Sequence, residues 1–453
     1  MNKPVHIVGG GLAGSECAYQ LGSRGIPTVL WEMRPTHSTP AHATGQLAEL
    51  VCSNSLRSDD PLHAAGLLKR EMERFGSLII ASARSAAVPA GSALAVDRVV
   101  FAATVTSALE SMSEVEICRQ EAAKIPEGDV VVATGPLTSA PIAQELAERL
   151  GEESLYFYDS IAPIVDGESL AMEELFWASR YGKGGQDYLN SPLDRDTYLG
   201  FHQALLDAEL APLHDSEQHL FFEGCLPIEE LARRGVDTLR FGPMKPVGLQ
   251  TPDGHRPYAV VQLRRESLAR DHFNLVGFQT RMKWPEQKRV LRQLPGLADA
   301  HFVRLGQVHR NTFINAPRHL DPYYRLRTEP RIRLAGQITG VEGYLESAAS
   351  GLAAAIYITQ DRQGRLPEAF PATTALGALT RHLTESPTKN FQPANINYGL
   401  FEPLQDQRIR GRSRRLERRR LLAERAGVEL ERWRLEHGLG EAETAPRPQA
   451  VAG

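Results

Sequence analysis

Val5-His6-Ile7-Val8-Gly9-Gly10-Gly11-Leu12-Ala13-Gly14 joins an apolar strand to a glycine-rich turn and then to a helix of small residues. Gly9 permits the tight turn, Gly11 lets the backbone approach a pyrophosphate, and Gly14 lets the helix pack close to the sheet. The helix N-terminus offers N–H groups and the positive end of its dipole to that pyrophosphate. A second strand, Thr28-Val29-Leu30-Trp31, ends at Glu32, which can accept hydrogen bonds from an adenosine ribose. This order of strand, turn, helix, strand and acid predicts a dinucleotide-binding α/β domain.

Two later segments favour FAD over NAD. The first, residues 129–135, is an apolar strand that ends in a small-residue turn, although it is equally typical of any strand in a parallel sheet. The second is a strand that ends at Gly336 and Gln337, followed by a small-residue helix that begins near Tyr344. The N-terminus of such a helix can face a flavin ring and favour negative charge on it. We therefore expect Gly336, Gln337 and Tyr344 in the cofactor site, with backbone contacts where flavoproteins usually place an Asp.

The composition is that of an ordinary soluble protein. The chain has 453 residues, of which 42% are hydrophobic and 23% charged, and this length favours two or three domains. No apolar run reaches the roughly 18 residues of a membrane span, and the nucleotide-binding strand begins too early to leave room for a signal peptide. The cysteines are widely spaced without a C-x-x-C pair, which argues against a disulfide framework and a structural zinc site. We expect a cytoplasmic protein with no metal and no membrane segment.

Strand and helix alternation predicts an α/β fold: an FAD-binding Rossmann-like doubly wound domain with an inserted α+β domain. The FAD-binding domain is expected in two parts, over residues 1–185 and 291–438. Residues 186–290 are richer in Pro, Arg and aromatic residues and are assigned to the inserted domain. Residues 439–453 have the composition of a disordered tail.

Two of the four cysteines lie in settings that suit a reactive thiol. Cys52 follows a short apolar stretch in a polar loop, and Cys225 stands just before Pro227, the expected first residue of a helix. A thiol beside a helix N-terminus has a lowered pKa and a more available thiolate. On this local pattern, a reactive and a structural role remain equally open for both residues. Cys17 and Cys118 are interpreted as small buried hydrophobic residues.

Several long strings resemble one known family, the folate- and FAD-dependent tRNA uracil-5-methyltransferases (TrmFO), from about residue 4 to residue 430. The strings cover residues 51–58, 179–185, 222–231, 240–248, 278–287, 306–315 and 336–350. Ser191 stands where the family leads us to expect a cysteine, and Ala394 where a methionine is usual.

The resemblance implies formation of 5-methyluridine at the T-loop uridine of tRNA. The carbon would come from 5,10-methylenetetrahydrofolate and pass through the reduced flavin, which NADH or NADPH reduces. Cys225 and Cys52 match the family's two functional cysteines. We expect Cys225 to add to C6 of the uracil, because C5 is otherwise a poor carbanion. Cys52 would act as the base at C5 or protect the flavin, although the two roles are also open to reversal.

The resemblance also suggests where the substrates bind. The folate pterin is expected near His309, Arg310 and Tyr344, with core packing as the alternative for the tyrosine. The tRNA is expected on Arg281, Lys283 and the basic run 408–425, which otherwise would be a solvated helix face. A net charge of −4 does not oppose this, because local clustering of charge decides phosphate binding. No obligate protein partner is evident.

Three other functions compete with this one. An FAD-dependent wobble-uridine tRNA modification protein shares the nucleotide fold, but it has a longer chain and does not explain the Cys225 segment. A small-molecule flavin oxidoreductase needs neither the basic run nor two cysteines in polar settings. A redox-sensing flavoprotein would bind partners without methyl transfer. Analysis of bound RNA separates the two tRNA-modifying functions from the other two.

Overall fold

The first domain of the computed structural model is built on a five-stranded parallel sheet. The structure describes residues 3–39, 41–151, 155–160, 162–211, 226–266, 271–306, 308–389, 391–404 and 414–439. The strand order is β16-β7-β1-β2-β6, for β1 (Val5–Val8), β2 (Thr28–Trp31), β6 (Val115–Cys118), β7 (Val130–Val132) and β16 (Ile332–Leu334). The chain leaves β1 toward β2 and returns on its other side with β7. This reversal creates a crevice at the carboxyl ends of β1 and β7, where ligands of open α/β sheets bind.

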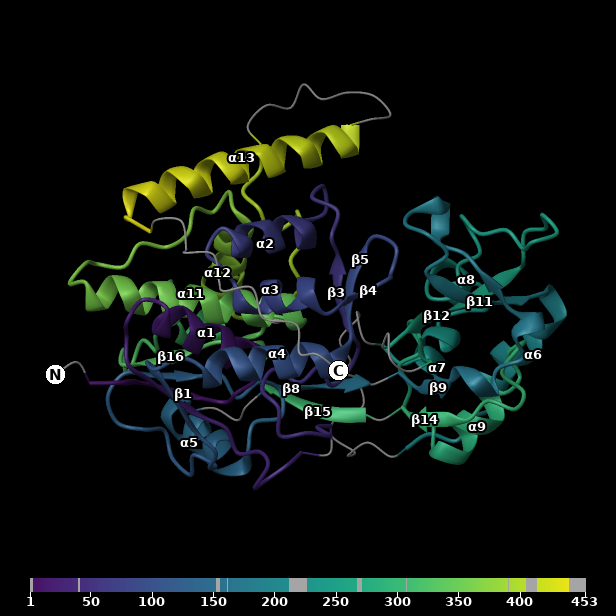
Figure 1. Cartoon of the computed structure of the whole chain (residues 1–453), viewed down its shortest axis with the longest axis horizontal. Helices are drawn as coiled ribbons and strands as arrows, with labels where there is room; N and C mark the ends of the chain where they lie inside the picture. The colour runs from purple at the N-terminus through teal and green to yellow at the C-terminus, as the bar shows by residue number, and fades with distance from the viewer. Residues whose placement is uncertain are drawn as a thin grey trace.

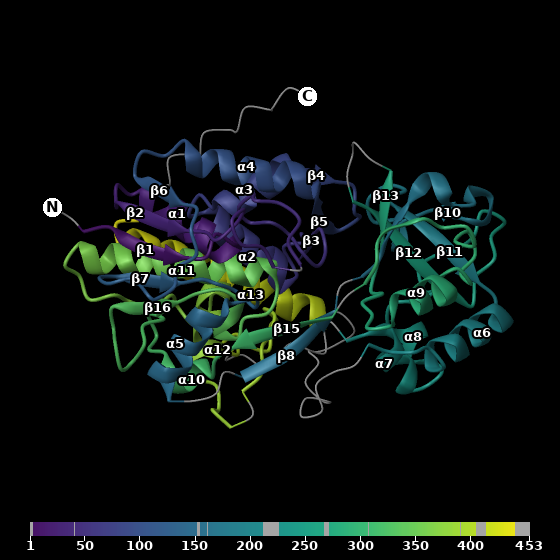
Figure 2. The same ribbon diagram turned by 90° about the horizontal axis from the view of Figure 1, so that it is seen from below.

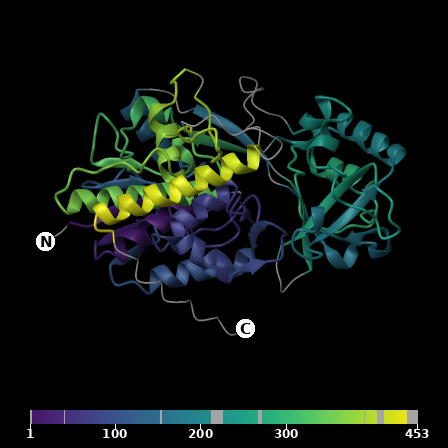
Figure 3. The ribbon, with the colours of Figure 1, turned by 90° about the horizontal axis from the view of Figure 1, so that it is seen from above.

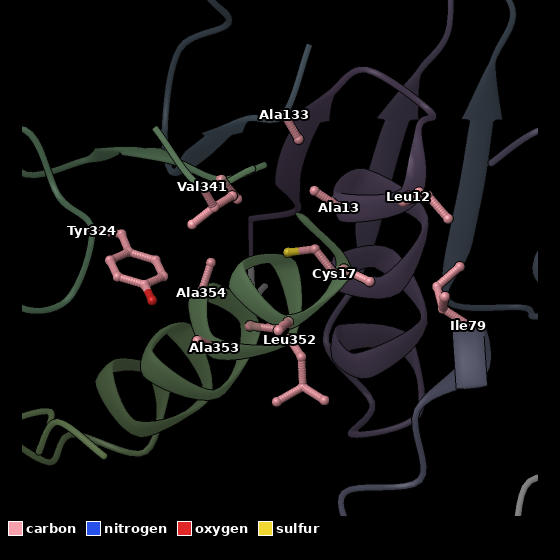
Figure 4. Packing of buried hydrophobic residues seen from close by; sticks show 14 of the residues in the cluster. Leu12, Ala13, Cys17, Ile79, Ala133, Tyr324, Val341, Leu352, Ala353 and Ala354 are labelled. Carbon is pink, nitrogen blue, oxygen red and sulfur yellow. The ribbon is translucent and has the colours of Figure 1, made fainter. Parts of the chain in front are cut away.

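Two helices of small residues cover one face of this sheet and pack tightly on each other. They are α1 (Leu12–Gly22) and α11 (Tyr344–Arg362). A Cβ on Gly351 would lie only 2.1 Å from the carbonyl oxygen of Ala13, so the backbones are in direct contact. Cys17 lies between the helices (Figure 4), fully buried as expected, and burial raises the pKa of its thiol.

Further helices extend the first domain on both sides of the sheet (Figure 1). Beyond α11 lie α2 (Ala64–Glu73), α12 (Ala375–Glu385) and the outermost helix α13 (Arg414–Glu436), which Figure 3 shows across this domain from above. Beside α1 lie α3 (Leu78–Ser85) and α4 (Arg98–Glu110). On the other side lie α5 (Ala140–Leu150) and the antiparallel pair β8 (Leu155–Ser160) and β15 (Val308–Phe313), whereas α10 (Ala316–His319) packs against α12. Helices on both faces confirm the doubly wound α/β fold.

The second domain is an antiparallel sheet with its own core. Its order is β10-β11-β12-β13-β9-β14, for β9 (Ile164–Asp166), β10 (Phe176–Trp177), β11 (Tyr188–Leu193), β12 (Ala259–Arg265), β13 (His272–Leu275) and β14 (Phe302–Arg304). The helices are α6 (Arg195–Leu206), α7 (Ile228–Arg233), α8 (Thr238–Phe241) and α9 (Trp284–Leu291) (Figure 2). β9 and β10 precede residue 186 and β14 follows residue 290, so the sheet reaches beyond the expected insert on both sides.

A small third sheet joins the two domains. Its order is β3-β5-β4, for β3 (Ser55–Ser58), β4 (Ala87–Val88) and β5 (Ala93–Val96). The buried Asn54 side chain donates to the carbonyl of Val96 and to that of Arg265, each at 3.1 Å. Its amide oxygen accepts from Nε of Arg264 at 2.8 Å, so the loop before β3 is fixed to the second domain. Across the described ranges, no helix has the length and apolarity needed to cross a membrane.

Candidate active site

A cavity opens at the crevice of the first sheet. It encloses about 1010 Å³, including the part open to solvent. Its lining includes every residue expected to bind the cofactor except Gly14, namely Gly9, Gly10, Gly11, Leu12, Ala13, Glu32, Gly336, Gln337 and Tyr344. It also includes Thr134 and Gly135, from the segment 129–135 that favoured FAD, and residues not singled out from the sequence, among them Arg34 and Ser347. The strand 130–132 thus leads to the cavity through the turn that follows it.

Gly9, Gly11 and Gly14 of the glycine-rich turn each have different surroundings. Gly9 has φ +107°, and a Cβ there would lie 2.6 Å from the carbonyl oxygen of Ala133. A Cβ on Gly14 would lie 1.9 Å from the carbonyl oxygen of Gly9, so this glycine allows the helix to approach the strand. Around Gly11, the N-cap of α1, no heavy atom lies within 4 Å of the Cβ position. The helix therefore presents bare backbone and open space to the cavity, which fits a pyrophosphate group.

Glu32 directly follows β2 and is a buried carboxylate. Its Oε2 accepts from the backbone N–H of Gly10 at 2.9 Å, and its Oε1 accepts from Nε of Arg34 at 2.8 Å. Burial opposes the charged form, but the hydrogen bonds from Arg34 and Gly10 outweigh it and hold the pKa of Glu32 below its ordinary value. Glu32 is therefore ionised at neutral pH. Arg34 also reaches Glu49 at 3.2 Å, so the arginine links the acid to the loop that leads toward Cys52.

The opposite wall of the cavity is formed by Gly336, Gln337 and the N-terminus of α11. The Gln337 side chain donates to Glu342 at 2.9 Å, and Gly336 has φ +83°. The wall at this point is therefore suited to backbone contacts. Helix α11 begins after Gly343, which offers no side-chain cap, so this end of the helix is suited to a ligand.

Tyr344 connects this wall to the loop that contains Cys52 and precedes β3, called here the Cys52 loop. Its phenol oxygen accepts hydrogen bonds from the backbone N–H of Cys52 at 2.5 Å and of Ser53 at 3.1 Å. Removal of the phenol from water, with the nearby Cys52 thiol, raises the pKa of Tyr344, so the residue is neutral at pH 7. One side chain thus borders the cavity and holds the backbone of a predicted catalytic residue.

Charged residues from both domains surround this loop. Arg98, at the start of α4, donates to the carbonyl of Leu50 at 3.1 Å and pairs with Glu266 at 2.8 Å. Arg304, at the end of β14, is half-buried. Burial and the nearby Arg98 lower its pKa, whereas Tyr344 and Cys52 act in the opposite direction. No local sequence pattern predicts these two arginines, because Arg98 and Arg304 come near each other only in the folded chain.

Three of the predicted site residues have no described side chain. Cys225 lies outside the described residues. His309 and Arg310 lie in β15, and their side chains are not described.

The two basic residues proposed for tRNA are in the second domain and have acidic partners. Arg281 donates to Glu230 at 2.7 Å, and Lys283 donates to Glu209 at 2.9 Å. The pair with Glu209 raises the pKa of Lys283. Both cations would have to exchange a carboxylate for a phosphate in order to bind RNA there.

Part of the basic run forms the exposed start of α13. Residues 408–413 lie outside the described ranges, and the side chains of 414 and 415 are not described. Arg420 pairs with Glu417 and Glu424 on the same helix face. Arg425 donates to the backbone carbonyls of Glu402 and Pro403. Arg418 is exposed to solvent and is the best placed of these side chains to meet a phosphate.

The fold and the glycine-lined cavity define an FAD-binding flavoprotein of the Rossmann type. Residues 4–365 match the family model "Glucose inhibited division protein A". Two crystal forms of Aquifex aeolicus GidA share this fold. Form II has a TM-score of 0.69 at 17% sequence identity, and the match covers 98% of this chain and 75% of the GidA chain. Form I has a TM-score of 0.68 at 16% sequence identity, and the match covers 98% of this chain and 77% of the GidA chain.

Proteins named methylenetetrahydrofolate--tRNA-(uracil-5-)-methyltransferase TrmFO match almost the whole chain. That of Geobacter sulfurreducens is 54% identical, over 96% of this chain and 99% of its own. That of Moorella thermoacetica is 53% identical, over 96% and 98%, and that of Enterococcus faecalis 50%, over 92% and 96%. The chain belongs to the TrmFO family.

Proposed function

We propose that the protein forms 5-methyluridine at the T-loop uridine of tRNA, with the carbon taken from 5,10-methylenetetrahydrofolate and the electrons from NADH or NADPH. The observation that carries the proposal is the link between Cys52 and the cofactor cavity through Tyr344. A cysteine whose neighbour Val51 and hydrogen-bond partner Tyr344 line a flavin cavity suits methylation of a pyrimidine, and the TrmFO relatives are named for that reaction.

The chain's own residues have separate tasks in this proposal. The backbone around Gly9 and Gly11, with Glu32, holds FAD, which supplies the redox chemistry when bound. Cys225 adds as a thiolate to C6 of the uracil, which makes C5 nucleophilic. Cys52 removes the proton from C5 or shields the flavin, and the two cysteines are also open to exchange of these roles.

The substrates would meet between the two domains. A flat pterin would stack near the ring of Tyr344, with His309 and Arg310 on β15 as further contacts. The tRNA would extend over Arg281, Lys283 and the basic run, in the cytoplasm. Local positive charge supports the tRNA partner, and the ion pairs with Glu230 and Glu209 reduce what Arg281 and Lys283 contribute.

The test is nucleoside analysis of unmodified tRNA after incubation with the protein, NADPH and methylenetetrahydrofolate. Two altered transcripts separate the candidate functions: one carries cytidine in place of the T-loop uridine, the other in place of the wobble uridine. We expect 5-methyluridine in the parent and wobble-altered transcripts and none in the T-loop-altered transcript. A product that depends on the wobble uridine would support the alternative tRNA modification, and no RNA product would favour a small-molecule oxidoreductase.

A further inference from the structure

We propose that the partly exposed Arg57 and the buried Glu346 form an ion pair that positions the Cys52 loop against the N-terminus of α11. Neither residue lines the cavity. Their effect on methyl transfer would therefore act through Cys52, and in this respect the inference rests on the proposed function.

A β-bulge aims the Arg57 side chain at α11. The pairing of β3 with β5 shifts register between Ser55 and Ser58, and Arg57 within this shift has φ +67°. A left-handed conformation is unfavourable for a residue with a Cβ, so the surrounding contacts must maintain it. The hydroxyl of Ser55 accepts from the backbone N–H of Arg57 at 3.1 Å, which supports the turn. Bulges of this kind commonly re-aim a side chain beside an active site.

Glu346 is the acceptor for Arg57, in the first turn of α11. Its Oε1 accepts from Nη1 of Arg57 at 2.5 Å and from the backbone N–H of Ile396 at 2.9 Å. The carboxylate is fully buried, and its Oε2 has no hydrogen-bond partner among the residues that the structure describes. Burial raises the pKa of Glu346. The positive charge of Arg57 opposes this rise more than any other neighbouring group does. A buried carboxylate without a paired cation is costly, so the ion pair specifies where Arg57 must lie.

The same helical turn holds the other end of the loop. Tyr344 accepts from the backbone N–H groups of Cys52 and Ser53, and Glu346 binds Arg57 five residues after Cys52. Nζ of the buried Lys69 donates to the carbonyl of Ser58 at 2.8 Å and fixes the chain just beyond the pair. The loop is thus attached to α11 at two points. Loss of one attachment should let the Cys52 thiol move relative to the cavity.

The test compares Glu346→Gln, Arg57→Gly and Arg57→Lys in the full-length holoprotein. Glu346→Gln keeps an acceptor for Ile396 but removes the charge. Arg57→Gly keeps the left-handed backbone at no steric cost, whereas Arg57→Lys keeps a cation that can reach the carboxylate. Arg74→Gln is the matched control, because it removes an ion pair with Glu431 at the surface between α2 and α13.

The readouts are FAD content, formation of 5-methyluridine, and the rate at which iodoacetamide alkylates Cys52, measured by mass spectrometry of its peptide. We expect Glu346→Gln and Arg57→Gly to keep their FAD, to change the alkylation rate of Cys52 at least fivefold and to lower methyl transfer at least tenfold. Arg57→Lys should partly restore the parent's alkylation rate of Cys52 and its methyl transfer. The control Arg74→Gln should match the parent in both.

An alkylation rate of Cys52 that equals the parent rate in both Arg57→Gly and Glu346→Gln would overturn the proposal. If Glu346→Gln fails to fold, the two Arg57 variants decide alone. Failure of the proposed function looks different: the parent would form no 5-methyluridine, or Cys52→Ala would form it at the parent rate. The alkylation comparison would still decide whether the pair positions the thiol.

Discussion

Gly11 gives the clearest single-residue test of the cofactor site. Because its Cβ position faces open space at the N-cap of α1, a leucine there would fit the protein but project toward the pyrophosphate position. We predict that Gly11→Leu folds and loses the flavin absorbance of the purified protein. Gly200→Leu is the control, because that glycine also has open space around it but lies in α6 of the second domain. Normal FAD content in Gly11→Leu would contradict the cavity assignment.

Tyr344 offers a second test at this scale. Tyr344→Phe keeps the ring at the cavity but removes the oxygen that accepts from Cys52 and Ser53. Two N–H groups then lose their partner, at a cost of roughly 1–3 kcal/mol for each one that water cannot reach. We predict retained FAD and methyl transfer lowered about tenfold, measured as 5-methyluridine formed per minute.

Tyr323→Phe is the matched control for that change, because its ring packs on Tyr357 away from the cavity. Equal losses of methyl transfer in both variants would indicate a general effect of removing a phenol oxygen.

Sequence reasoning at the residue scale works best for residues that are close together in the chain. Gly9, Gly10, Gly11 and Glu32 lie within one strand–helix–strand unit, and all four line one cavity in the structure. The contact between Cys52 and Tyr344 joins residues 292 positions apart, and no local pattern reports it. The Arg57–Glu346 pair was not predicted for the same reason, since it depends on the fold and on one left-handed residue.

At the scale of elements, α2 is joined to α12 by one buried acid. Glu71 accepts from the backbone N–H groups of Ala375 and Leu376 at the start of α12. Burial raises the pKa of Glu71 from 4.5 to about 7. A raised folded-state pKa gives stability that is fully present below pH 4.5 and is lost as the pH rises through 7.

We predict a pH-dependent difference between the parent and Glu71→Gln. The free energy of unfolding of the parent, relative to the variant, should fall by about 3 kcal/mol between pH 4.5 and pH 7. Urea unfolding at several pH values measures it. Glu148→Gln, on the exposed side of α5, controls for the loss of a solvated carboxylate. A constant difference for Glu71→Gln across this range would show that the acid does not titrate there.

The basic residues at the start of α13 allow a separate prediction about tRNA binding. Joint replacement of Arg414, Arg415, Arg418 and Arg419 by glutamine should weaken tRNA binding without affecting flavin reduction by NADPH. Each lost phosphate contact lowers the slope of log affinity against log salt by roughly 0.7–0.9. Arg432→Gln is the control, because this exposed arginine lies near the other end of the helix and pairs with Glu429. Unchanged affinity and salt slope in the fourfold variant would identify the run as a solvated helix face.

The second sheet extends beyond the expected boundaries of the inserted domain because its short outer strands could not be recognised from the sequence. The change in composition marked 186–290, but β9 and β14 are three-residue strands without a pattern that separates them from loops. They join the sheet because β13 and β14 both pair with β9, which is a long-range choice. The longer helices α1 and α11 were predictable, because their small residues and the glycines before them are local signals.

On the scale of the whole molecule, the two domains meet at the Cys52 loop. The first domain supplies the cavity and Tyr344, and the second supplies Arg264 and Glu266 around the same loop. A site at this position can bind a cofactor in the first domain and a macromolecular substrate on the side of the second domain. This arrangement suits transfer of a carbon to a nucleotide within a folded RNA.

The most direct test of that function follows the carbon itself. The parent protein is incubated with NADPH, unmodified tRNA and methylenetetrahydrofolate labelled with ¹³C in its methylene group, and the nucleosides are analysed by mass spectrometry. We predict that the label appears in the methyl group of 5-methyluridine, only at the T-loop position, and that omission of the folate abolishes the product. Unlabelled 5-methyluridine, or no methylated uridine in tRNA while NADPH is consumed, would contradict the proposed reaction.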